Sequence, residues 1–431
     1  MQLKPFLLDM WLDTYDHEIE FNLAASTGPC WTLNEILSLA GDEERQRFLH
    51  HNLVYSRPAG AEGLRAAIAD MQGVNVDSVQ VVTGASEALL ILMWLAAEPG
   101  ANVVLPRPGY APFSALPESL GIETRFYALR RENEFRIDVD EVKKLADENT
   151  KMIVVNSPHH PTGATISDAE LDSLHDFAWS RGIQLVNDEV YHPIYHPIYQ
   201  DGATESGSDA AWLTRQEGDA GDPFGVRLRA GSSLRLKNGC AQDDTVQKEA
   251  KLYHCPRSAA RLPHATVIHD FSKAFPLSGV RTGWMIEHDP KRRELYWNAR
   301  AYFSISNNTA GEMLAEIAMR HRNTVLGKTQ ETATRNLRRL EGFMAEHRDK
   351  LGWVPPRGGM TAFPWLLSGE NSRAFCRAAA EQGILLAPGD CFDAPSHFRL
   401  GFAAMTDKFP DAMDRLGEFV SSWSAAEMAR T

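Results

Sequence analysis

The chain has 431 residues, and 43% of them are apolar, a composition typical of an ordinary globular protein with two or three domains. Its 44 basic and 57 acidic residues give a formal net charge of −13, which argues against nucleic acid and anionic membranes as main partners because both attract basic surfaces. The longest apolar run, residues 88–97, is too short to span a bilayer, and the first nine residues are too short for a signal peptide. We therefore expect a cytoplasmic protein.

Neither the cysteines nor the histidines suggest a disulfide framework or a metal centre. The five cysteines are odd in number and lie without paired spacing, so we expect reduced thiols. His192 and His196 are four residues apart and could bind a metal on a helix, but Pro193 and Pro197 oppose a helix there. We predict that the protein has no metal site.

Residues 1–45 are predicted to form an N-terminal arm and part of a small domain. The arm carries acidic side chains and then a turn-rich stretch, residues 24–29, which includes Gly28. An amphipathic helix is predicted at 63–71. Tyr55 precedes this helix and by itself is typical of a core residue.

From residue 79 onward, short apolar strands alternate with helices, which is the pattern of a parallel sheet with helical crossovers. The predicted strands are 79–82, 103–105, 153–155, 184–187, 265–268 and 284–286. The predicted fold class is α/β, with a mostly parallel sheet, helices on both of its faces and a smaller α+β domain. Ligands collect at the carboxyl ends of the strands in such sheets.

Residues with binding chemistry follow these strands closely. Gly84, Ala85 and Ser86 lie between a strand and a helix, where free N–H groups and the helix dipole form a phosphate seat, although many such turns bind nothing. Tyr110 presents an aromatic ring at the sheet edge. Asp188 ends another strand, where a carboxylate costs little if it bonds a cation such as a protonated pyridine nitrogen.

A lysine and an arginine lie close together after the strand at 265–268. Lys273 follows this strand, and Arg281 comes eight residues later. A lysine amine forms a Schiff base with an aldehyde, and an arginine guanidinium grips a phosphate. Pyridoxal 5'-phosphate (PLP) carries both groups, so the pair predicts PLP as the cofactor. The alternative is that both residues are ordinary loop cations.

In order and spacing, these motifs resemble the class I/II aminotransferases among the fold-type I PLP-dependent enzymes, over residues 20–200 and 262–425. The resemblance implies that Lys273 is the catalytic residue that forms the Schiff base, and that Asp188 bonds the pyridine nitrogen. It also implies cofactor-binding roles for residues that match the family's ring and phosphate contacts, namely Gly84, Ala85, Ser86, Tyr110, His160, Tyr191, Ser272 and Arg281.

The same resemblance extends to the substrate and to a second subunit. Arg399 matches the arginine that holds the substrate α-carboxylate, for which a bidentate guanidinium is well suited. Gly28 is expected to contact the substrate as well. Tyr55 matches a tyrosine that reaches the phosphate in the partner subunit's site, which implies a homodimer. The implied small-molecule partners are an amino acid and a 2-oxo acid.

Two residues depart from the family pattern. His160 stands where the family usually has an asparagine that bonds the cofactor's 3'-oxygen; a neutral histidine can still donate one hydrogen bond, but its reach and titration differ. Asp270 stands where the family often has a serine that contacts the phosphate. A carboxylate would repel that phosphate, so we expect Asp270 to point elsewhere or to accept from a nearby donor.

The predicted division of the chain has two main parts. We expect a large PLP-binding domain at residues 46–300 and a small C-terminal domain at 301–431, which begins with a long helix near residue 301. Residues 201–258 are rich in Gly, Ser, Asp and Lys and show no sustained periodicity. This stretch is predicted to be disordered or a surface insertion within the large domain.

The predicted reaction is amino-group transfer from an amino acid to a 2-oxo acid, with Lys273 as general base. Two alternatives stay open: a PLP-dependent lyase or cyclase, because one fold hosts several reactions, and a non-catalytic PLP-binding domain. The chain has no second arginine motif for a side-chain carboxylate. Together with the acids of the arm, this predicts neutral or cationic amino donors; the acids are Asp13, Asp16, Glu18 and Glu20.

Overall fold

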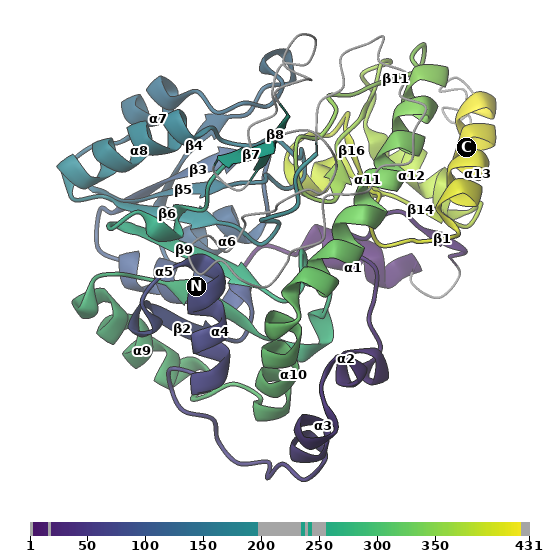
Figure 1. Ribbon diagram of the computed structural model, residues 1–431. Coiled ribbons are helices and arrows are strands. Elements are labelled where there is room, and N and C mark those ends of the chain that lie inside the picture. The colour runs from purple at the N-terminus through teal and green to yellow at the C-terminus, as the bar shows by residue number, and fades with distance from the viewer. Residues whose placement is uncertain (1–2, 16–18, 197–233, 238–239, 244–255, 424–431) are drawn as a thin grey trace.

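The fold is described from a computed structural model, which places residues 3–15, 19–196, 234–237, 240–243 and 256–423. A large domain built on a twisted sheet lies beside a smaller domain of helices and short strands (Figure 1). No helix in these ranges is long and apolar enough to cross a membrane.

The large domain is organised around a seven-stranded sheet with the order β2-β10-β9-β6-β5-β3-β4. All neighbouring strands are parallel except β10, which is antiparallel to both β2 and β9. The mostly parallel sheet predicted from the sequence is therefore confirmed. The strands are β2 (Val79–Val82), β3 (Asn102–Arg107), β4 (Glu123–Ala128), β5 (Thr150–Asn156), β6 (Gln184–Asp188), β9 (Ala265–Asp270) and β10 (Gly283–Ile286).

Helices cover both faces of this sheet, as predicted. Alternate strand residues point to opposite faces, so Val154 and Val155 belong to two different apolar clusters. One cluster includes residues of α5 (Ala85–Ala96), α6 (Pro112–Ser119) and α9 (Pro290–Phe303). The other includes residues of α4 (Glu62–Gln72), α7 (Val139–Leu145), α8 (Asp168–Arg181) and α10 (Thr309–Arg320).

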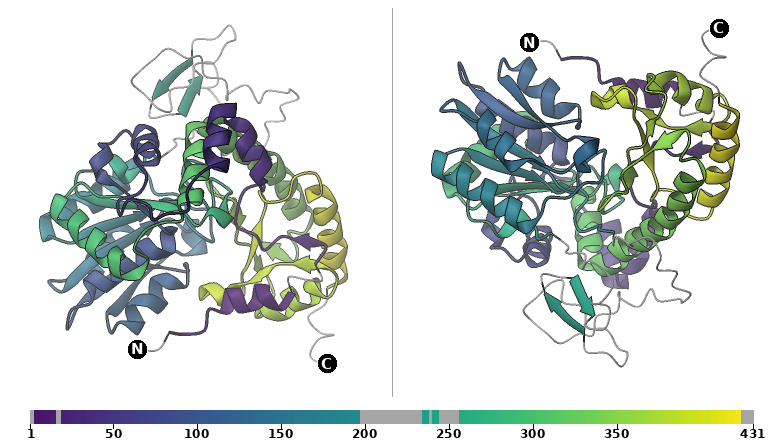
Figure 2. Two further views of the ribbon diagram at one scale, coloured as in Figure 1. Left: turned by 90° about the horizontal axis from the view of Figure 1, so that it is seen from below. Right: turned by 90° about the horizontal axis from the view of Figure 1, so that it is seen from above.

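The small domain combines segments from both ends of the chain. The N-terminal helix α1 (Leu7–Tyr15) lies against it in both views of Figure 2, and Trp11 Nε1 donates a 2.8 Å hydrogen bond to Leu386 O. Strand β1 (Phe21–Asn22) pairs in parallel with β14 (Ile384–Leu385). The remaining elements are α11 (Arg322–Glu346), β11 (Leu351–Gly352), β12 (Thr361–Ala362), β13 (Trp365–Leu366), α12 (Ser372–Ala380), β15 (Ala387–Pro388), β16 (Phe398–Gly401) and α13 (Phe409–Ser422).

The long helix expected near residue 301 begins elsewhere. Residue 301 lies in the last turn of α9, which starts after its N-cap Asp289 and ends before Ser304. Helix α10 then packs against α4 and against α2 (Leu33–Leu39) on the large-domain side. The 25-residue helix α11 leads into the small domain. The expected helix start near residue 301 was wrong because helical patterns on both sides of Ser304 look alike in sequence, and the domain boundary at 300/301 stays a prediction.

Most of the predicted insertion, residues 201–258, lies outside the described residues. Within it, β7 (Leu234–Lys237) and β8 (Cys240–Asp243) pair as an antiparallel ribbon. Its last residue is held against the sheet, because Ser258 Oγ donates to Glu189 Oε2 at 2.6 Å. Between the arm and the large domain, the chain forms α3 (Asp42–Leu49).

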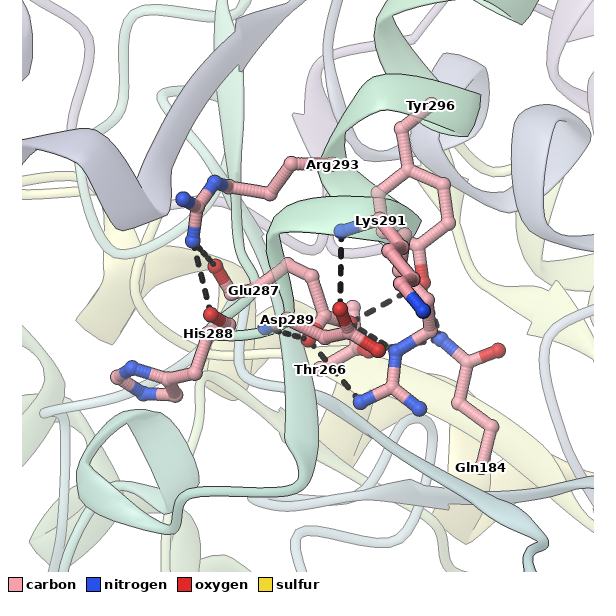
Figure 3. A network of polar contacts seen from close by, with 9 residues as sticks. Gln184, Thr266, Glu287, His288, Asp289, Lys291, Arg293 and Tyr296 are labelled. Carbon is pink, nitrogen blue, oxygen red and sulfur yellow. Dashed lines mark hydrogen bonds and ion pairs between the residues drawn. The ribbon is translucent and has the colours of Figure 1, made fainter.

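A buried polar network at the edge of the sheet fastens α9 to β9 and β10 (Figure 3). Glu287, 1% exposed, accepts from Thr266 Oγ1 at 2.7 Å and from Tyr296 Oη at 3.2 Å. Arg292 adds an ion pair to the same carboxylate through Nε at 2.9 Å and Nη2 at 3.0 Å. A carboxylate this enclosed is stable only while its donors stay in place.

We expect Glu287→Gln to lower the free energy of unfolding by about 2 kcal/mol, because the substitution breaks a buried ion pair and turns a donor toward other donors. The value is below that of fully buried pairs since the Arg292 side chain is 27% exposed. Urea unfolding followed by tryptophan fluorescence measures the change. Glu294→Gln, exposed on the same helix, is the matched control and should shift stability by less than about 0.5 kcal/mol. Equal stabilities for the two variants would contradict this account of the network.

Candidate active site

Several of the predicted site residues lie where the carboxyl ends of the parallel strands meet the small domain. Asn156 and Asp188 end the neighbouring strands β5 and β6 and are register partners. Asp270 ends β9, the next strand of the sheet, and Lys273 follows three residues later. From the small domain, Arg399 on β16 reaches His160 of the large domain.

The Lys273 amine lies next to the N-terminal segment. Its Nζ donates a 3.0 Å hydrogen bond to Ser26 Oγ. Burial lowers the pKa of Lys273, and the negative charge of Asp270 opposes this shift. A lowered pKa favours the neutral, nucleophilic amine. Sequence reasoning missed Ser26, because a serine in a turn-rich stretch carries no periodic signal.

Gly28, whose contact with the substrate stays a prediction, lies against the backbone of the lysine loop. Its N–H points to Lys273 O at 3.5 Å. A Cβ at this position would lie 2.7 Å from Thr329 Cγ2 of α11, so the close approach of the two segments requires glycine. The described contacts of Gly28 are therefore packing contacts.

Asp188 is a buried carboxyl group that has no ion pair among the described residues. Its Oδ1 accepts from Val190 N at 3.2 Å, and burial raises its pKa to about 7. Asn156 braces this strand end, because its Nδ2 donates to Asp188 O at 3.0 Å and its Oδ1 accepts from His160 N at 2.7 Å. A cation placed beside Asp188 would stabilise the ionised carboxylate.

A group of aromatic rings lies within reach of the charge of this carboxyl group. The Tyr191 and His160 rings are stacked, with centroids 6.2 Å apart and an interplanar angle of 14°. Tyr110 meets His160 edge-on at 6.2 Å, and Phe6 from the arm meets Tyr110 edge-on at 6.0 Å. Burial raises the pKa of both tyrosines, so each phenol keeps its proton and can donate a hydrogen bond.

The turn between β2 and α5 has the shape of an anion seat. Gly84 has a φ of +78°, and a Cβ there would lie 3.0 Å from Arg281 Nη2. Helix α5 begins directly afterwards with Ala85 and Ser86, whose N–H groups are at its positive end. Arg281 Nη1 also approaches Ser272 Oγ at 3.5 Å. The four residues predicted for a phosphate cradle, Gly84, Ala85, Ser86 and Arg281, therefore lie together, with Ser272 beside them.

The contact with Arg399 indicates which ring nitrogen of His160 carries the proton. Arg399 Nη1 donates to His160 Nε2 at 2.8 Å, so Nε2 is an acceptor and the proton of the neutral imidazole is on Nδ1. Burial lowers the pKa of both His160 and Arg399. His160 Nδ1 and Arg399 Nε are buried and have no hydrogen-bond partner in the described part of the chain. Two donors are thus available to a ligand.

Two other sequence expectations concern residues at the margin of this site. Tyr55 is 80% exposed, and its expected role in a partner subunit's site stays a prediction. Asp270 accepts from Ser272 N at 2.8 Å and approaches Ala85 N at 3.5 Å, so its carboxylate lies within the predicted cradle. In the described residues, no group of three or more His, Cys, Asp or Glu could hold a metal ion.

The site fits PLP in three observable ways. Asp188 is a buried carboxyl group suited to a protonated ring nitrogen, His160 Nδ1 is an unpartnered donor, and the turn at Gly84 leaves room that a Cβ would fill. A lysine amine completes the set. These parts, on a sheet of this topology, define a fold-type I PLP-dependent enzyme.

The chain belongs to the class I and II aminotransferase family, whose model matches residues 32–210 and 244–413. Capreomycidine synthase of Streptomyces vinaceus is 25% identical over 399 residues, which cover 92% of this chain and 88% of that protein. Tyrosine aminotransferase of Bos taurus is 34% identical over 362 residues, which cover 80% of this chain and 68% of that protein. The solved structure of the PLP-dependent cyclase OrfR has the same fold, with a TM-score of 0.76, 24% identity and 98% of each chain covered.

Proposed function

We propose that the protein transfers an amino group from an amino acid to a 2-oxo acid. The observation that carries this proposal is the Lys273 amine, which lies in one site with a buried carboxyl group and an arginine from the other domain. When bound, PLP supplies the electron sink that makes the α-proton of an amino acid acidic. The residues around PLP have to bind the substrate, orient it and move its α-proton.

Each of these tasks has a suitable side chain. Arg399 binds the substrate carboxylate through its guanidinium, and its unpartnered Nε gives it a free donor for that purpose. Lys273 takes the α-proton and returns it, for which a pKa lowered by burial is favourable. With PLP bound, Asp188 would keep the ring nitrogen protonated. Tyr191 and His160 Nδ1 are the donors that would serve the ring's 3'-oxygen.

The direct test is product analysis. Purified protein supplied with PLP, an amino donor and a 2-oxo acid should form a new amino acid in a one-to-one ratio with the keto acid of the donor. Ammonia released without any 2-oxo acid present would contradict transfer.

A PLP-dependent lyase or cyclase is the second candidate. It is supported by His160, which replaces the family's usual asparagine, and by relatives whose names describe a synthase and a cyclase. An imidazole donor next to the ring differs from an amide in pKa and reach, and such differences can redirect one bond cleavage toward another. Ammonia release, or a product with the mass of the substrate less water, would identify this reaction class.

We also propose that the active form is a homodimer. Leu53, Val54 and Tyr55 are 84%, 65% and 80% exposed, and the Arg300 guanidinium bonds Pro58 O, which brings this stretch next to α9. Tyr302 at the end of α9 is 84% exposed. Exposed apolar side chains in such a group are typical of a protein interface. Sedimentation equilibrium should give twice the mass of one chain.

The cytoplasmic location expected from the sequence stays a prediction.

For the donor, we expect neutral or cationic amino acids to be preferred over aspartate and glutamate by about tenfold or more in kcat/KM, because a side-chain carboxylate would lack a partner. The N-terminal arm supports this preference through Asp9, which is not one of the four acids predicted from the sequence. Phe6 contacts Tyr110, and the negative charge of Asp9 acts on both Tyr110 and Arg399, whose pKa values are shifted mainly by burial. Rates with leucine, arginine, aspartate and glutamate decide the matter. Preference for the acidic donors would refute it.

A further inference from the structure

A carboxylate occupies the anion seat of this site. Asp270 is 6% exposed, and its Oδ1 accepts from Ser272 N at 2.8 Å. Its Oδ2 lies 3.5 Å from Ala85 N, the first N–H of helix α5. Both N–H groups belong to segments that form the phosphate cradle. The Asp270 carboxylate therefore lies on two N–H groups that could otherwise bind an anionic ligand.

The position of Asp270 relative to Arg281 leads to the same conclusion. A Cβ built on Gly84 would be 3.0 Å from Arg281 Nη2 and 3.9 Å from Asp270 Oδ2, so the guanidinium and the carboxylate flank one point. The charge of Asp270 also acts on Lys273 and Asp188, both of which are shifted mainly by burial. Within the described ranges, Asp270 itself has no ion pair that would neutralise it.

We propose that Asp270 is a specificity-determining residue that competes with the phosphate of the cofactor for this seat and so limits the affinity for the phosphorylated form. Two negative groups in one partly desolvated seat repel each other, and both draw on the N-terminus of one helix. The proposal rests on the cofactor site described above. It concerns the affinity of the site for the phosphate group rather than the reaction itself.

The competing explanation is that Asp270 only shapes the turn before Lys273 through its bond to Ser272 N. Asp270→Asn separates the two, because the amide keeps an oxygen that can accept from Ser272 N while it removes the charge. Asp270→Ser is a second variant with a smaller hydroxyl acceptor, in case the asparagine protein fails to fold. Asp407→Asn, an exposed substitution away from the site, is the control.

The test is calorimetric titration of the cofactor-free protein with PLP and with pyridoxal, which lacks the phosphate. Asp270→Asn should lower the Kd for PLP by about tenfold or more and leave the Kd for pyridoxal within about twofold of wild type. Inorganic phosphate should compete with PLP more strongly in this variant. Asp407→Asn should behave as wild type with both ligands.

Three results would overturn the proposal: an unchanged Kd for PLP in both variants, weaker PLP binding in the asparagine variant, or equal changes for PLP and pyridoxal. The last pattern would mean that Asp270 acts on the ring or on the lysine. Failure of the site assignment looks different, because the wild-type protein would then bind neither PLP nor pyridoxal.

Discussion

Lys273→Ala is expected to lower kcat by on the order of 10⁵-fold, since it removes both the amine that bonds the cofactor aldehyde and the base that moves the α-proton. Binding of PLP should persist, because the anion seat at Gly84 and the buried carboxyl group of Asp188 are provided by other residues. Single-turnover assays and calorimetric titration measure the two quantities separately.

Lys273→Arg is the matched variant for this experiment. It retains a positive charge that could still meet Ser26, but a guanidinium does not form the Schiff base, so turnover should be lost to the same extent. Activity above one hundredth of wild type in either variant would mean that another residue carries the chemistry.

Arg399→Lys is expected to lower kcat/KM by about 100-fold or more for α-amino acids. A lysine cannot form the bidentate contact with a carboxylate, and it leaves two buried acceptors, Ala24 O and His160 Nε2, without their present donors. Loss of the His160 contact also frees the imidazole to change its tautomer. The effect should therefore exceed that of a lost carboxylate contact alone.

A comparison of substrates isolates the role of Arg399. For an amine that lacks the α-carboxylate, wild type and Arg399→Lys should differ by less than about tenfold, because the contact removed is one that this substrate never makes. Arg415→Lys on the outer helix α13 is the control and should retain wild-type rates. Equal losses for both substrates would show that Arg399 acts mainly on the fold.

Much of the large domain could be predicted from the sequence because its strands are short, continuous apolar runs that end in glycine, proline or polar residues. For the same reason Asp188 and Lys273 could be placed at one edge of the sheet. The antiparallel direction of β10 could not be predicted, since a run buried on both faces looks the same in either direction.

Contacts between segments far apart in the sequence could not be predicted from sequence patterns. Ser26 meets Lys273 across 247 positions, and His160 meets Arg399 across 239. No periodicity in either segment carries information about the other. Likewise, the sequence indicated that Asp270 conflicts with a phosphate, but not that its carboxylate would lie 3.5 Å from Ala85 N in the seat itself.

The pairing of β1 with β14 has a consequence for how the protein matures during synthesis. The arm strand is synthesised long before its partner strand, Ile384–Leu385, so the two cannot pair until the residues between them have been made. Contacts of such long sequence separation form slowly. The large domain can therefore collapse early around its sheet, whereas the pocket closes last, when Arg399 on β16 arrives. A nascent chain stalled before β14 should be compact but unable to bind an amino acid carboxylate, because it lacks Arg399.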